Sequence, residues 1–303
     1  YPATGPYVIA PRVPGDRVTL VRNPFFKQWS VAAQPAGFPD EIDLEFGLPN
    51  ADKMIKAVED GRADFMLAIP VGRLHELRTQ YASQLHVSSQ PTTRWLDLNT
   101  RIAPFDDVRV RRALNFAVDR RLFIERFGGP MVGRPTCQIL PPNFPGYAPF
   151  CRYTAHAGRT TQWLAPDMAR ARQLIKMSGT GGSHVTVWSD GPGLFLGMRY
   201  VVSLLRQLGY RTSLRVIEDG NRMVELAGDS RNKAQVVGID GWLGDYPAGS
   251  DFFEPNFSCD AFVPKSQSNS NLSEFCSPRI DSQMRHAATL QATHPRSAAR
   301  LWA

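Results

Sequence analysis

The alternation of hydrophobic and polar positions predicts a first region of short strands around one helix. Residues 17–22 and 40–46 alternate, which is typical of half-buried strands. Asn50 is a suitable N-cap for a helix that Gly61 ends, and the apolar run over 63–69 predicts a buried strand. The pattern therefore predicts a strand–helix–strand order in this part of the chain.

A second region begins near residue 95 and opens with a strongly patterned helix. Asp106 or Asp107 is placed to cap this helix. Its apolar stripe consists of Val110, Ala113, Leu114, Ala117 and Val118. The proline-rich stretch over 130–166 predicts an ordered surface loop, and a further helix is expected from Pro166 to Gly179.

Strands and helices alternate regularly from residue 184 onward. Strands are predicted over 184–188, 211–217 and 234–240, with helices over 194–208 and 220–227 between them. This βαβαβ order predicts an α/β fold with a mainly parallel sheet and right-handed crossovers. Ligands of such sheets bind beyond the carboxyl ends of the strands. The run GWLGDYP over 241–247 directly follows the last predicted strand.

The composition is that of a globular protein, with 43% hydrophobic and 21% charged residues. The net charge of +7 raises the possibility of nucleic-acid binding. The densest group of arginines, over 109–126, is interspersed with acids, so we interpret it as a solvated helix face and expect no nucleic acid as partner.

The four cysteines form two pairs that are local in sequence, Cys137 with Cys151 and Cys259 with Cys276. Each pair brackets a polar loop, which favours two disulfides over free buried thiols. Neither pair has the close spacing of a zinc site. Disulfides predict an oxidising compartment outside the cytoplasm. No signal pattern opens the chain, so we expect a processed or excised segment whose secretion signal lies elsewhere.

Local motifs do not support catalysis. His75 and Glu76 begin like a metalloprotease motif, but position 79 is Thr. The six histidines lack metal-ligand spacing, and no G-x-S-x-G sequence occurs. We therefore expect no enzyme, no metal and no cofactor.

Two residues of the GWLGDYP run have side chains suited to binding. Trp242 offers a flat apolar wall, and the Asp245 carboxylate would pair with an ammonium group in a crevice that excludes water. The alternative is that Asp245 only opens a turn. The residues alone leave both interpretations open.

Several runs resemble one family, the bacterial extracellular solute-binding proteins of family 5, the peptide and nickel receptors of ABC importers. They are TGPY (4–7), VRNPFF (21–26), GRADFML (61–67), LNTRIAPFDDVRVRRALNFAVDR (98–120) and GWLGDYP (241–247). The runs follow the family's order across nearly all 303 residues.

The resemblance implies a two-lobed α/β fold of the periplasmic-binding-protein type (type II) that closes over its ligand by hinge motion. It divides the chain into lobe I (1–96, part), lobe II (97–245) and a return to lobe I (246–303, part). The first lobe is expected to be incomplete, because family members extend further at both ends.

The same resemblance implies which residues contact the ligand. The aspartate of the family's G-W-x-x-D run, here Asp245, receives the α-amino group of a peptide, and Trp242 lies beside it. Tyr246 and Asn99 lie where the chain crosses between lobes and are further candidates. The family's carboxylate-binding arginine falls near Leu196 here, so Arg199, one turn later, is a weaker candidate.

The resemblance thus predicts a non-catalytic importer component that captures peptides or similar solutes. Its expected partners are membrane permease subunits, and a monomer is expected. It would act in the periplasm or anchored to the cell envelope. The alternatives are a ligand-sensing domain of a larger envelope protein and a secreted hydrolase.

Overall fold

The computed structural model describes residues 3–303 apart from 12–14, 16, 47–49, 67–70 and 143. The chain forms two compact units, Tyr1–Leu85 and His86–Ala303, which are described separately here. The division into three lobe segments stays a prediction. Among the described residues, no helix is long and apolar enough to cross a membrane.

The first unit contains a three-stranded antiparallel sheet and two helices. The sheet has the order β1 (Tyr7–Ile9), β2 (Arg17–Arg22) and β3 (Glu41–Glu45). The helices are α1 (Ala51–Glu59) and α2 (Leu74–Gln80), with the 3₁₀ turn η1 (Val71–Arg73) before α2. Asn50 caps α1 as predicted, since its side chain accepts a hydrogen bond from the Lys53 amide.

The strand predicted over 63–69 does not form in the part of that run that the structure describes. Residues 63–66 are irregular, and Phe65 is largely exposed. Residues 67–69 lie outside the described residues. The prediction of this strand depended on apolar content alone. It failed because a strand also needs a neighbouring strand to pair with, and the sequence does not specify one.

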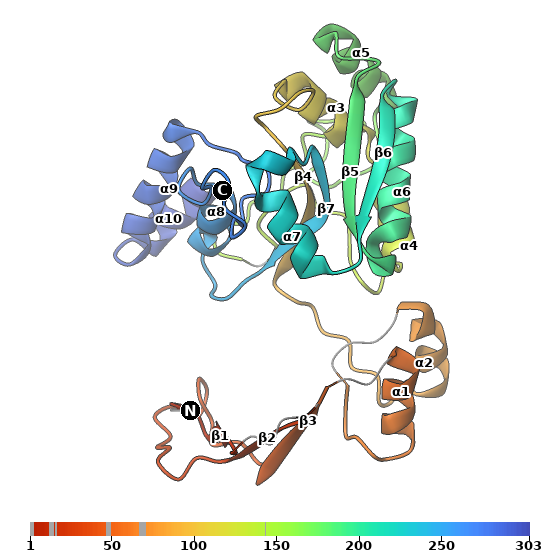
Figure 1. Ribbon diagram of the computed structural model, residues 1–303. Helices are drawn as coiled ribbons and strands as arrows, with labels where there is room; N and C mark the ends of the chain where they lie inside the picture. The colour runs from red at the N-terminus through yellow and green to blue at the C-terminus, as the bar shows by residue number, and fades with distance from the viewer. Residues whose placement is uncertain (1–2, 12–14, 16, 47–49, 67–70, 143) are drawn as a thin grey trace. The chain divides into compact units, whose positions relative to one another are not determined.

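The second unit is built on a four-stranded sheet in the order β4-β7-β5-β6 (Figure 1). Its strands are β4 (Thr92–Leu98), β5 (His184–Asp190), β6 (Arg211–Ile217) and β7 (Val236–Leu243). β5 is parallel to both β6 and β7, and β4 is antiparallel to β7. The predicted mainly parallel sheet is confirmed, and the carboxyl ends of β5, β6 and β7 meet at one edge.

Helices cover both faces of this sheet (Figure 1). On one face lie α3 (Val108–Ala117), α4 (Arg120–Phe127), α5 (Met168–Ser178) and α6 (Pro192–Gln207). On the other face lies α7 (Gly220–Gly228), followed by the 3₁₀ turn η2 (Ser230–Asn232). Asp107 caps α3, as the pattern predicted, and Gly179 ends α5 in the left-handed conformation.

Alternation along β5 explains this two-sided burial. Val185 and Val187 are fully buried in the larger cluster under α6, and Trp188 packs with Met223 of α7 on the other side. Side chains in a strand alternate between faces, so a strand covered on both sides is apolar on both.

The last part of the chain is helical and packs beside the sheet in the same unit. It comprises α8 (Gly249–Phe257), α9 (Pro278–Gln291) and α10 (Pro295–Trp302). Phe252 and Trp302 lie in its apolar cluster, into which Trp242 of β7 also packs. This contact joins the end of β7 to the three helices.

Both predicted disulfides are present. Cys137 is bonded to Cys151 within the proline-rich loop, and Cys259 is bonded to Cys276 between α8 and α9. The Asp281 carboxylate also accepts a hydrogen bond from the Cys259 amide (3.1 Å). The second disulfide therefore reinforces a loop that is already fixed to α9.

Replacing Cys259 and Cys276 together by serine is expected to lower the free energy of unfolding by about 3 kcal/mol. The disulfide joins two cysteines with a sequence separation of 17. Without it the unfolded chain has more conformational entropy, which lowers the free energy of unfolding. Urea denaturation would measure the loss. The matched control is the Cys137→Ser, Cys151→Ser pair, which should give a similar loss. An unchanged midpoint in either variant would contradict the prediction.

Candidate functional site

The candidate site lies at the carboxyl edge of the four-stranded sheet, where the GWLGDYP run leaves β7. β7 extends to Leu243, three residues beyond the predicted end at residue 240. The reason is β4, since Thr92 pairs with Leu243 and Thr93 pairs with Trp242. Trp242 is therefore a strand residue, and Asp245 follows two residues after the strand.

Asp245 presents an exposed carboxylate on a fixed backbone. Its amide donates a hydrogen bond to Oδ2 of Asp251 (2.9 Å). Among the described residues, none donates a hydrogen bond to the Asp245 carboxylate or forms an ion pair with it. The carboxylate is thus held in place through its main chain and is available to an external cation.

Asp251 organises this turn and was not predicted from the sequence. It lies in the first turn of α8, is only 2% exposed, and also accepts a hydrogen bond from Nε1 of Trp242 (3.3 Å). The partial positive charge at a helix N-terminus stabilises a carboxylate in this position. One buried side chain therefore fixes two of the predicted ligand residues, Trp242 and Asp245. The available signal was an acidic residue in the first turn of the helix that follows the motif.

Trp242 and Tyr246 flank Asp245 in different environments. Trp242 is half-buried against the cluster that contains Phe252. Tyr246 is half exposed, and its hydroxyl forms a hydrogen bond with the hydroxyl of Ser250 (3.3 Å). The structure therefore brings three of the five predicted ligand residues together around the first turn of α8.

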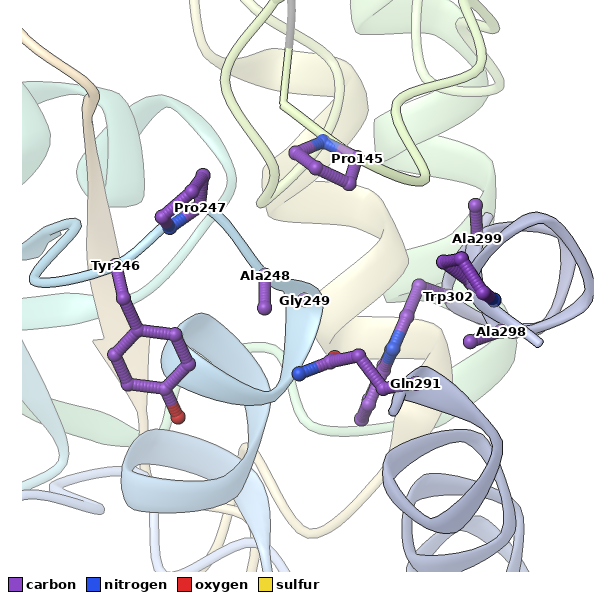
Figure 2. A pocket seen from close by; sticks show the side chains of 10 residues that line it. Pro145, Tyr246, Pro247, Ala248, Gly249, Gln291, Ala298, Ala299 and Trp302 are labelled. Atoms are coloured by element: carbon purple, nitrogen blue, oxygen red, sulfur yellow. The ribbon is translucent and has the colours of Figure 1, made fainter. Parts of the chain in front are cut away.

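A pocket of about 350 Å³ begins one residue after Asp245 (Figure 2). It lies between the start of α8, the loop before Gly146 and the last two helices. Its lining is mostly apolar and consists of Pro145, Tyr246, Pro247, Ala248, Gly249, Gln291, Pro295, Ala298, Ala299 and Trp302. Trp302 is buried, and its indole Nε1 has no hydrogen-bond partner among the described residues. The pocket could hold an apolar side chain next to a group bound at Asp245.

The structure places Asn99 and Arg199 away from this turn. Asn99 follows β4, and its amide donates to the carbonyl of Gln235, so it lies at the opposite end of β7 from Asp245. Its buried side chain donates to Oε1 of Glu274 (2.8 Å). Arg199 is an exposed residue in the middle of α6. Ligand contact by either residue stays a prediction.

Across the described parts of the chain, no group of three or more His, Cys, Asp or Glu side chains is arranged to hold a metal ion. This edge of the sheet offers an exposed carboxylate, an aromatic wall and an apolar pocket. These groups fit a ligand with a cationic amine next to an apolar side chain.

Comparison with known proteins gives consistent similarities. The sequence profile described as bacterial extracellular solute-binding proteins, family 5 Middle, matches residues 1–263. A glutathione-binding protein of Salmonella choleraesuis is 24% identical over 306 residues, covering 99% of this chain and 55% of the relative. A probable di/tripeptide-binding protein of Pseudomonas aeruginosa is 26% identical over 260 residues, covering 82% of this chain and 45% of the relative.

Solved structures show the same fold. The clavulanic acid biosynthesis oligopeptide binding protein 2 superposes with a TM-score of 0.82 at 23% identity, covering 98% of this chain and 54% of that one. The predicted α/β fold of the periplasmic peptide-binding proteins is thereby confirmed. The chain spans about half the length of the curated relatives it matches.

Proposed function

Since the chain belongs to the bacterial extracellular solute-binding proteins of family 5, we propose that it captures peptides for an ABC importer and binds the peptide's α-amino group on Asp245. In this role it does no catalysis, closes over its ligand by hinge motion, and delivers it outside the cytoplasm, as a monomer, to membrane permease subunits. The relatives named for glutathione and for di- and tripeptides support a peptide ligand.

One observation carries the proposal: the Asp245 carboxylate is exposed while its backbone is fixed by Asp251. An ammonium group gains a charge-assisted hydrogen bond from such a carboxylate, and the bond strengthens when closure excludes water. Because the turn is already ordered, ligand binding carries no entropy cost for ordering it.

Asp245→Asn is expected to weaken the binding of leucyl-alanyl-alanine at least tenfold, because the charge that pairs with the ammonium group is lost. Titration calorimetry on the purified protein would measure this. N-acetylation of the peptide should weaken binding to the wild type by a similar factor and have little further effect on Asp245→Asn.

The control is Asp260→Asn, which removes an exposed carboxylate elsewhere in the same unit and should leave affinity unchanged. Equal binding of the free and acetylated peptides by the wild type would exclude amine recognition at Asp245. Conversion of the peptide into smaller products during the titration would instead favour a hydrolase.

The pocket beside Asp245 is proposed to take the first side chain of the peptide. Ala299→Phe should fill it from α10, so peptides that begin with leucine should lose affinity several-fold while peptides that begin with glycine keep theirs. Competition binding with the two peptide series would test this. Leu301→Phe, at an exposed position of α10 outside the pocket, is the control. Equal losses for both series would contradict the assignment.

A further inference from the structure

The helices on one face of the four-stranded sheet carry the excess positive charge of the chain. α3, α4, α5 and α6 contain eleven arginines and lysines and a single acid, Glu125. Residues 97–217, which include these helices, hold 17 Lys and Arg and 7 Asp and Glu, whereas the rest of the chain holds more acids than bases. The net charge of +7 is therefore concentrated in one part of the second unit (Figure 1).

Most of these cations are exposed and lack an acidic partner. Ion pairs are frequent elsewhere, as between Arg73 and Glu76 or between Arg231 and Asp229. On the four helices, seven exposed side chains form no ion pair with any described residue: Arg112, Arg121, Arg126, Arg170, Arg172, Lys176 and Arg206. Their charge is thus not compensated within the described part of the chain.

The acids that are close to these cations in sequence are held at the starts of the helices. Asp107, Asp119 and Asp167 are the N-caps of α3, α4 and α5, and each accepts a hydrogen bond from a main-chain amide. A carboxylate at this position interacts favourably with the helix dipole. The sequence mixes the two signs over 109–126, but the fold places these acids at helix ends and the arginines along exposed sides.

Exposed apolar side chains accompany the cations. Val108 of α3, Met177 of α5 and Leu196 of α6 are 42%, 57% and 53% exposed. Met177 directly follows Lys176 in the last turn of α5. The stems of arginine and lysine are apolar as well, so the helices present cationic groups together with aliphatic surface. The boundary between lipid headgroups and acyl chains binds this combination.

We propose that the exposed side of α3, α4, α5 and α6 docks the protein on a membrane surface that contains anionic phospholipids. Guanidinium groups form strong, charge-assisted hydrogen bonds with phosphate, and each cation near an anionic surface adds to the attraction. The turn that carries Asp245 lies between β7 and α8 and not on these helices. Lipid docking is therefore independent of peptide binding at Asp245.

The test is cosedimentation of the purified chain with vesicles of phosphatidylcholine, with and without one third phosphatidylglycerol. The wild type should bind the vesicles that contain phosphatidylglycerol and should not bind those of phosphatidylcholine alone. Raising the NaCl concentration from about 0.05 M to about 0.5 M should release most of the protein, because salt screens exposed charges.

A triple variant tests whether the helix layer is the docking surface. Arg112→Gln, Arg126→Gln and Arg172→Gln together remove one cation from each of α3, α4 and α5, and none of the three side chains bonds to another described residue. The variant should bind phosphatidylglycerol vesicles at least tenfold more weakly. Lysine at the same three positions should retain binding, since the charge is kept. Thermal denaturation should verify that each variant is folded.

The matched control removes three exposed arginines from α9 and α10, with Arg279→Gln, Arg296→Gln and Arg300→Gln. It has the same net charge as the first triple variant and should bind vesicles within twofold of the wild type. Equal losses in the two triple variants would overturn the assignment to α3, α4, α5 and α6. Failure of the wild type to bind phosphatidylglycerol vesicles while it binds polyglutamate would overturn lipid docking in favour of an acidic protein partner. The first triple variant should bind leucyl-alanyl-alanine as the wild type does, so failure of lipid docking leaves the proposed function untouched.

Discussion

Asp251→Ala is expected to lower the free energy of unfolding by about 3 kcal/mol and to weaken peptide binding at least tenfold. The buried carboxylate accepts hydrogen bonds from Nε1 of Trp242 and from the amide of Asp245, and a bond to a charged group contributes about 1.5–3 kcal/mol. Without it, both donors lose their acceptor, and the turn that carries Asp245 has to be ordered by the ligand.

Urea denaturation and calorimetry would measure the two losses on the same preparations. Asp251→Asn keeps one acceptor oxygen, so its losses should be intermediate. The indole proton of Trp242, followed by NMR, should move in both variants because its hydrogen bond changes. An Asp251→Ala protein that is folded and binds peptide as tightly as the wild type would show that the turn holds its shape without this carboxylate.

The second unit could be predicted well from the sequence because its signals are local. Asp107 precedes a helix whose apolar stripe has a helical period, and β5 and β6 appear as short runs rich in β-branched residues with one helix between them. Such features depend on neighbours within a few residues. The strand predicted over 63–69 depended instead on a pairing partner, and residues 63–66 show that apolar content alone does not supply one.

The centre of the candidate site was predictable, but the residues that support it were not. Asp245 could be identified because the run that carries it resembles a family motif and follows a strand. Asp251 acts through a bond to the main chain of a residue six positions earlier, and many helices carry an acid in the first turn. Arg94 lies opposite Gly241 of the run only through the register of β4 against β7, which is a long-range pairing that no local pattern specifies.

Gly241→Ala is expected to destabilise the second unit by about 3 kcal/mol, because overpacking a well-packed site costs about 1–3 kcal/mol and here the neighbours are backbone atoms. The new Cβ would lie 2.7 Å from the carbonyl oxygen of Thr93 and 3.1 Å from Cα of Arg94. Neither atom can rotate away, so β4 and β7 have to separate at the start of the run that carries Asp245.

The matched control is Gly181→Ala, where no atom lies within 4 Å of the built Cβ and the backbone is not left-handed. This variant should be neutral or slightly more stable, since alanine restricts the unfolded chain. Urea denaturation of both variants separates the steric effect from the loss of a glycine as such. Adding Arg94→Ala to Gly241→Ala relieves only the contact with Cγ. If that double variant regained full stability, the steric clash would lie in the arginine side chain. We expect instead that most of the loss remains, because the contact with the Thr93 carbonyl is unchanged.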